Sequence, residues 1–262
     1  MASSDSKVHV SITLHTSEPH QISISDPAPA STLALIAEIR QIASPRAGEP
    51  ITLLTNFSAL DATETDAFKL LRMAFPQCTT DPDKRILMKP ISSRVTYIRL
   101  LGDLDIRKRD DLVFVTVPAI DQGAATVRWS LNPEHMLRFY DGTLEEKLSR
   151  FQPGEVYRIK IRSMCLTWWT FGALDGDLAD KKFARWMLPA DVDEGGDVSS
   201  RLLDRINRHS VNRLSSQSCV ENEEKPDVEK MTKEGWVFSE NEDMLEVECP
   251  GQEEGTTFKF VE

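Results

Sequence analysis

Hydrophobic and polar residues alternate along much of the first 190 residues. In "VHVSITL", Val8, Val10, Ile12 and Leu14 share one face and polar residues occupy the other, which is the period of two expected for a half-buried strand. "PITLLTNF", "RVTYIRLL" and "DLVFVTVP" are rich in β-branched residues and are bounded by Pro, Asp or Gly, as strands usually are. We also predict strands in "HQISIS", "TVRWSL", "EVYRIKIRS" and "MCLTWWTF".

Other segments carry helix or turn signals. "STLALIAEIRQIA" fits either a strand or a helix, because its hydrophobic residues satisfy both periods. "GTLEEKLSRF" predicts a short helix, since Leu144, Leu148 and Phe151 have helical spacing. "QPGE" predicts a type II turn with Pro153 and Gly154 at its central positions.

Many short strands with little helix predict a mainly β fold. We expect residues 1–190 to form one antiparallel, Ig-like β-sandwich with a short helix. Residues 191–220 are predicted to be a linker and a basic amphipathic helix. Residues 221–262 are predicted to be an acidic tail, with strands near Trp236, Leu245 and Phe258 that could form a small β-meander.

The predicted helix carries a basic stripe formed by Arg201, Arg205 and Arg208 at positions i, i+4 and i+7. Such stripes usually belong to a solvated helix face. The alternative is a partner-binding surface for an acidic protein, and the tail of the same chain could itself be that partner.

Charge and composition argue against nucleic-acid binding and against membrane contact. The net charge is −11, and acidic and basic residues balance before residue 191, so the acidity belongs to residues 191–262. A protein without a basic surplus is not expected to bind nucleic acid. The 262 residues include no apolar run long enough for a signal peptide or a membrane span, so we expect a cytoplasmic protein without membrane contact.

The cysteine and histidine content predicts neither disulfides nor a metal site. Four cysteines lie far apart with no CxxC pair, and there are five histidines, so free thiols in a reducing compartment are expected. The run "DGDLAD" does not satisfy a calcium loop, because Asp180 and Trp186 occupy the positions that require glycine and a bidentate acid. We predict no cofactor, and the oligomeric state stays open.

Common enzyme motifs are missing from the sequence. GxSxG, GxxxxGK[ST], GxGxxG after a strand and HExxH do not occur. Catalytic residues can still come together from distant parts of a chain, so an enzyme is less expected rather than excluded.

The adjacent Trp168 and Trp169 are the most distinctive candidate site. Consecutive strand residues point to opposite faces, so one indole can join the core while the other needs separate cover or lines a pocket. A pocket could stack a sugar or another small molecule on the indole, with Asp175, Asp177 and Trp186 beside it. The candidate ligand-binding residues are therefore these five.

The alternative to a pocket is a structural cover. We predict that "DLADKKFARWML" forms a helix with Asp177 as its N-cap. Phe183 and Trp186 would then lie on one side of that helix and seal the second indole. Burial is the commonest use of large aromatic side chains, which favours this alternative.

A longer motif resembles a known group of proteins. From "FQPGEVYRI" to "WWTFGALDGDLADKKFARW", the chain resembles a family of uncharacterised filamentous-fungal proteins over about the first 190 residues. The strand order before it is similar to the sandwich pro-segment of fungal deuterolysin-type proteases, but no HExxH follows, so protease activity is not implied. The resemblance implies a fungal source and a β-sandwich. The matching residues are Pro153, Gly154, Glu155, Tyr157, Arg158, Trp168, Trp169, Gly172, Asp175, Asp177, Leu178, Lys181, Lys182 and Trp186.

These patterns together favour a non-enzymatic binding or protein-interaction module. A small-molecule or carbohydrate-binding module and an accessory enzyme of fungal secondary metabolism are the alternatives. Burial of both indoles would argue against sugar stacking on them, and a pocket with convergent titratable groups would argue for an enzyme.

Overall fold

The protein is mainly β, as the sequence predicts. The computed structural model describes residues 7–25, 33–56, 58–61, 76–86, 105–131, 133–137, 140–159, 161, 166, 168–187, 227–250 and 256–262. The strands are β1 (Val8–Thr16), β2 (Gln21–Ser23), β3 (Leu33–Ala43), β4 (Ile51–Leu54), β5 (Gln77–Cys78), β6 (Phe114–Val117), β7 (Ala125–Leu131), β8 (Val156–Ile159), β9 (Trp169–Phe171), β10 (Lys182–Met187), β11 (Trp236–Ser239), β12 (Leu245–Glu248) and β13 (Thr256–Val261). The helices are α3 (Pro133–Met136), α4 (Leu144–Leu148), α7 (Val228–Lys233) and two 3-10 turns, Ile106–Lys108 and Glu242–Met244.

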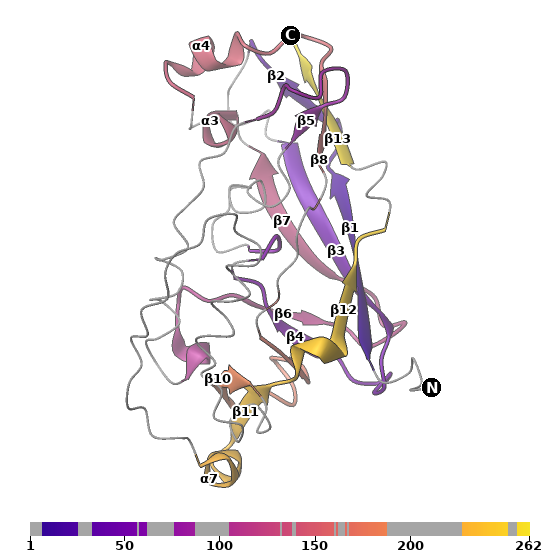
Figure 1. Ribbon diagram of the computed structural model, residues 1–262, viewed down its shortest axis with the longest axis vertical. Helices are drawn as coiled ribbons and strands as arrows, with labels where there is room; N and C mark the ends of the chain where they lie inside the picture. The colour runs from indigo at the N-terminus through magenta and orange to yellow at the C-terminus, as the bar shows by residue number, and fades with distance from the viewer. Residues whose placement is uncertain are drawn as a thin grey trace.

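The described strands form four sheets. Their orders are β12-β1-β3-β7, β2-β13-β8-β5, β6-β4-β9 and β10-β11. The described pairs within residues 1–190 are antiparallel, as predicted. The pairs β1–β12, β2–β13 and β10–β11, which each include a strand after residue 227, are parallel, so three of the sheets contain parallel pairs. In Figure 1, β2, β5, β8 and β13 gather at the end that holds α3 and α4, and β10, β11 and α7 lie at the opposite end.

The segment "STLALIAEIRQIA", whose hydrophobic residues fit either a strand or a helix, forms the strand β3. It pairs antiparallel with both β1 and β7. Leu33, Leu35, Ala37 and Ile39 are almost fully buried and follow the strand period. Pairing on both edges decides between the two periods, because residues from Leu35 to Ile39 then have a partner strand on each side.

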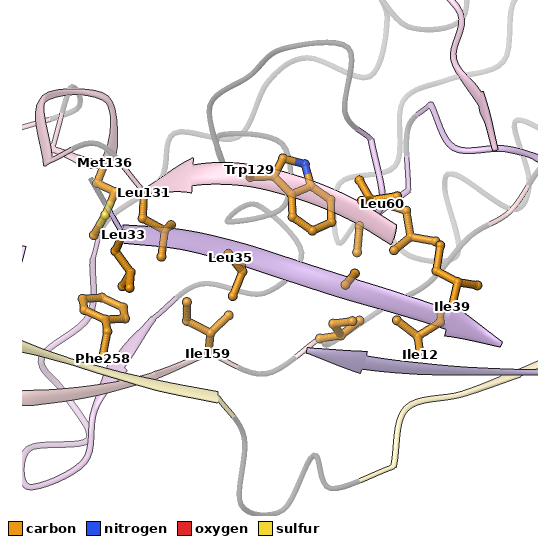
Figure 2. Close-up of a cluster of buried hydrophobic side chains, with 14 of the residues drawn as sticks. Ile12, Leu33, Leu35, Ile39, Leu60, Trp129, Leu131, Met136, Ile159 and Phe258 are labelled. Atoms are coloured by element: carbon orange, nitrogen blue, oxygen red, sulfur yellow. The ribbon is translucent and has the colours of Figure 1, made fainter. Parts of the chain in front are cut away.

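Both four-stranded sheets contribute to one hydrophobic core. Figure 2 shows Leu33 and Leu35 of β3 facing Phe258 of β13 and Ile159 of β8. Trp129 of β7 is fully buried, and its indole N–H donates to a backbone carbonyl oxygen 3.0 Å away. The core therefore depends on strands from both ends of the chain.

The three strands after residue 230 do not form a meander, so that prediction is wrong. The strands β11, β12 and β13 belong to three different sheets. In its sheet β13 lies between β2 and β8, and its Phe258 and Phe260 are fully buried. Each strand pairs with an earlier strand because its hydrophobic residues complete a core that residues 1–190 leave open. The predicted division near residue 190 therefore does not separate independent folding units.

The predicted turn and the predicted short helix are both present. In the turn, Glu155 N donates to Gln152 O at 3.1 Å and Gly154 has φ of 97°. The short helix α4 begins after Thr143, which forms a capping box with Glu146. The segments "RVTYIRLL" and residues 191–220 lie outside the described residues. Within the part of the chain that the structure describes, no helix has the length and apolar character of a membrane span.

Candidate functional site

Trp168 is buried in a small second core. Its exposed fraction is 2%, its ring stacks on Phe183 with centroids 4.8 Å apart, and Phe114 meets both rings edge-on. The Trp168 indole N–H donates to Ala184 O at 2.9 Å. Both faces and the polar edge of this indole therefore serve internal packing.

Trp169 belongs to the main core, as opposite pointing of consecutive residues predicts. Its exposed fraction is 1%, and its indole N–H donates to Asn241 O at 3.2 Å. Ser239 from β11 accepts a hydrogen bond from the Trp169 backbone N–H at 3.1 Å. Neither tryptophan presents a ring face to solvent, so the proposed stacking of a sugar on Trp168 or Trp169 is wrong.

The element that covers Trp168 is a strand, not the predicted helix. Residues 182–187 form β10, which pairs in parallel with β11. A helix would need the carbonyl oxygens of Leu178 and Lys181 for its own amides. Lys182 N, which a helix would pair with Leu178 O, donates to Gly235 O instead, while Leu178 O accepts from Lys181 N in a turn. The Arg107 guanidinium also donates to Leu178 O and, at 3.2 Å, to Lys181 O, and it lies over the Phe183 ring.

The carboxylate of Asp105 completes this cover. The residue is 5% exposed, and its carboxylate accepts from Phe183 N at 3.0 Å. Gly172 has φ of 108°, and a Cβ there would lie 2.9 Å from Leu178 Cγ, so the turn needs glycine at this position. Arg107 and Asp105 were not singled out from the sequence, because they lie some 70 residues before the turn that they hold.

The other residues of the predicted site do not converge. Asp175 and Asp177 lie exposed on the turn before β10, and Asp177 does not cap a helix. The backbone of Trp186 lies in β10, and its side chain is outside the described residues, as are Arg201, Arg205 and Arg208. In the described ranges, no group of three or more His, Cys, Asp or Glu side chains is placed to hold a metal ion.

A different surface, the outward side of the sheet β2-β13-β8-β5, carries basic side chains without acidic ones in its described strands. The inward residues of this sheet, among them Ile22, Tyr157 and Phe258, are fully buried. The alternate positions point outward, and none of these positions in the four described strands is acidic. We call this surface the Arg158 face, and its residues are Gln21, Ser23, Gln77, Val156, Arg158, Thr257, Lys259 and Val261.

Arg158 lies at the centre of this face, on the inner strand β8. Thr257 is directly opposite on β13, and Gln77 is directly opposite on β5. The side chain is partly buried, and among the described residues its buried Nε has no hydrogen-bond partner. An unsatisfied buried donor destabilises a protein by about 1–3 kcal/mol. Arg158 thus places a positive charge at the centre of this face, although its Nε is enclosed by protein atoms.

The inward side at the same end holds an ion pair. Lys84 Nζ lies 2.6 Å from Glu155 Oε1, and Glu155 Oε2 accepts from Gln152 N and from the Tyr157 hydroxyl. Burial alone would raise the pKa of Glu155, but these hydrogen bonds and the Lys84 charge hold the pKa below its ordinary value. Burial, followed by the Glu155 charge, raises the pKa of Tyr157. All three groups thus satisfy one another, which indicates a structural role.

The turn between β1 and β2 brings together a hydroxyl, an imidazole and a carboxylate. Thr16 Oγ1 lies 2.5 Å from His20 Nδ1, and Glu18 Oε1 lies 2.6 Å from His20 Nε2. The order matches that of a catalytic triad. The Glu18 side chain is 83% exposed, so water screens its charge. This chain of contacts is better suited to holding the turn than to activating the hydroxyl.

Comparisons with known proteins add no assignment. No protein-family model matches the chain, and no curated protein or solved structure matches it. The fungal resemblance therefore stays a prediction, and the function has to be argued from the geometry.

Sequence patterns predict part of the Arg158 face. The alternation in "EVYRIKIRS" places Arg158 on the polar side of its strand, and "TTFKFV" does the same for Lys259. What the patterns lack is the pairing of β8 with β13, which brings two segments about a hundred residues apart onto one surface.

Proposed function

We propose that this protein is a non-enzymatic binding module that holds a protein partner on the Arg158 face. The observation that carries the proposal is the pair of cations Arg158 and Lys259 on one face, where no outward residue of the four described strands is acidic. A partner carboxylate would pair with these cations on binding, and a charge-assisted hydrogen bond of this kind is among the stronger polar contacts. No carboxylate among the outward residues of the four described strands competes with a partner for Arg158 and Lys259.

Two further parts of the proposal concern fold and compartment. A β-sandwich of the two four-stranded sheets is supported by their shared core cluster. A cytoplasmic location is supported by Cys78, which is a buried free thiol, as expected for a reducing compartment.

A site-specific crosslinking experiment tests the function. A photoreactive amino acid at Gln21, which is exposed on the Arg158 face, is incorporated into the full chain. After irradiation in an extract of the source organism, we expect one crosslinked protein, whose purified form then binds the full chain. The Arg158→Gln/Lys259→Gln variant should lose the crosslink and the binding.

Arg128→Gln is the matched control, because Arg128 is an exposed outward arginine on β7 of the other four-stranded sheet. It should keep both the crosslink and the binding. Equal capture by the double variant and the wild type would contradict a partner-binding role for the Arg158 face.

The two alternatives have weaker support. Carbohydrate binding through the tryptophan pair loses its basis, since both indoles are buried and hydrogen-bonded inside the protein. For an accessory enzyme, the contacts of Thr16, Glu18 and His20 give weak support, because the carboxylate is exposed to water.

A further inference from the structure

We infer that the ligand of the Arg158 face is a short, extended acidic peptide that carries carboxylates at alternate positions. One carboxylate binds Arg158 and the next binds Lys259. This inference rests on the proposed function and names the chemistry of the partner segment.

Strand register sets the spacing of the two cations. Arg158 is directly opposite Thr257, and Lys259 lies two residues further along the same strand and on the same side of the sheet. Diagonal neighbours of this kind are about 7–8 Å apart, with their Cβ atoms somewhat closer. Alternate side chains of an extended peptide are about 6.6 Å apart. A Glu-x-Glu segment therefore matches both cations without bending, whereas adjacent acidic residues point to opposite sides.

The chemistry of Arg158 favours a carboxylate. A guanidinium presents parallel N–H groups that match the two oxygens of a carboxylate, and it keeps its positive charge throughout the physiological pH range. Thr257 and Gln77 flank Arg158 with neutral polar groups, and Val156 lies opposite Lys259. No outward residue of the four described strands would repel the incoming carboxylate.

The charge of the whole chain limits the length of the ligand. A net charge of −11 repels long polyanions such as nucleic acids. Two cations next to each other can still bind a short segment, since the local field dominates within a Debye length of about 8–10 Å. We therefore assign a peptide segment with two carboxylates.

Fluorescence polarisation of labelled peptides with the full-length protein tests the inference. Three extended peptides of equal length carry Glu-Val-Glu, Glu-Glu-Val or Gln-Val-Gln between the same flanking residues. We expect the alternating acidic peptide to bind at least five-fold more tightly than the other two. Added salt should weaken its binding.

Matched variants assign the binding to the face. Arg158→Gln should weaken binding of the alternating peptide about ten-fold or more, because a charge-assisted contact to a partly buried group is lost. Lys259→Gln should weaken it about two- to five-fold, as expected for an exposed ion pair. Arg128→Gln should leave it unchanged. Thermal melting of each variant confirms that the protein is folded.

Several results would overturn the inference. Equal affinity for the alternating and adjacent peptides would contradict the spacing, and unchanged affinity of folded Arg158→Gln would contradict the site. Displacement of the peptide by inorganic phosphate at lower concentration than by free glutamate would identify a phosphate group as the ligand instead. Self-association that Arg158→Gln abolishes, measured by sedimentation, would identify a second copy of the chain.

The crosslinking experiment separates the two proposals. If the double variant loses its crosslinked partner but no acidic peptide binds, the Arg158 face is a docking site and the ligand chemistry is wrong. If neither assay responds to the variants, the proposed function itself is wrong.

Discussion

The pKa of the Glu155 carboxyl differs between the folded protein and the unfolded chain. Its two oxygens accept from Lys84 Nζ, from the Tyr157 hydroxyl and from the Gln152 amide. These contacts disappear on unfolding, so the pKa of Glu155 is lower in the folded state than its ordinary value of 4.5. The ionised form of Glu155 therefore favours folding.

The pH dependence of stability follows from this difference. A lowered folded-state pKa contributes stability above the unfolded pKa, and the contribution is lost as the pH falls through the folded-state value. We expect the free energy of unfolding to fall between pH 5 and pH 3, and Glu155→Gln to flatten this fall while lowering stability at pH 7. Urea denaturation at several pH values measures both. A slope between pH 5 and pH 3 that is identical in Glu155→Gln and wild type would contradict the assignment.

At the scale of an element, β13 alternates between core and surface. Phe258 and Phe260 are fully buried among aromatic rings, and Phe258 stacks with Tyr157 at a centroid distance of 5.8 Å. Lys259, between them, is exposed. The strand thus joins the hydrophobic core and the Arg158 face within three consecutive residues.

The effect of substitutions along β13 on the free energy of unfolding should alternate in the same way. Phe258→Ala should lower the free energy of unfolding by about 3–5 kcal/mol, since it removes a buried ring and leaves a cavity. Lys259→Ala should change it by less than about 0.5 kcal/mol, as expected for an exposed position. Chemical denaturation of both variants measures the difference. Similar losses for the two variants would show that β13 is not placed as described.

Hydrophobic periodicity predicts where strands lie in the sequence, but it does not predict which strands pair with each other. The alternation of Val8, Val10 and Ile12 identified β1, and the turn at Gly154 was read correctly from four residues. The strand β10 was taken for a helix because the contacts that decide it come from Arg107 and from β11, both remote in sequence. Hydrophobic spacing describes one segment, whereas pairing depends on surfaces that exist only after folding.

The candidate site was predicted less well than the fold for the same reason. Large aromatic residues attract attention in a sequence, and here Trp168 and Trp169 are both used for packing. Arg158 is one of many residues in the sequence motif, and only the sheet order places it beside Lys259 on a side where the four described strands have no outward carboxylate.

Over the whole molecule, the two ends of the chain are paired with each other. The strand β12 pairs with β1 and β13 pairs with β2, both in parallel, and Figure 1 shows β12 and β13 running beside the strands of the N-terminal region. The strands β11, β12 and β13 therefore complete sheets begun by the earlier part of the chain, and Phe258 and Phe260 belong to the main core.

Removal of residues 227–262 should consequently abolish folding. The truncated chain would expose the inward sides of β8 and β2, so we expect loss of the cooperative thermal transition and of the near-ultraviolet circular dichroism signal. Adding a peptide of residues 227–262 should restore part of both signals. A truncated chain that melts as cooperatively as the full-length protein would contradict the shared core.

The position of β13 between β2 and β8 also has a consequence for synthesis in the cell. The ribosome makes β8 about a hundred residues before β13, and translation adds roughly 5–20 residues per second. For about 5–20 seconds the nascent chain therefore carries an unfilled gap between two finished strands, with apolar surface and unpaired edges of the kind that aggregates. We expect production of this protein to depend on chaperones that bind the nascent chain during that interval.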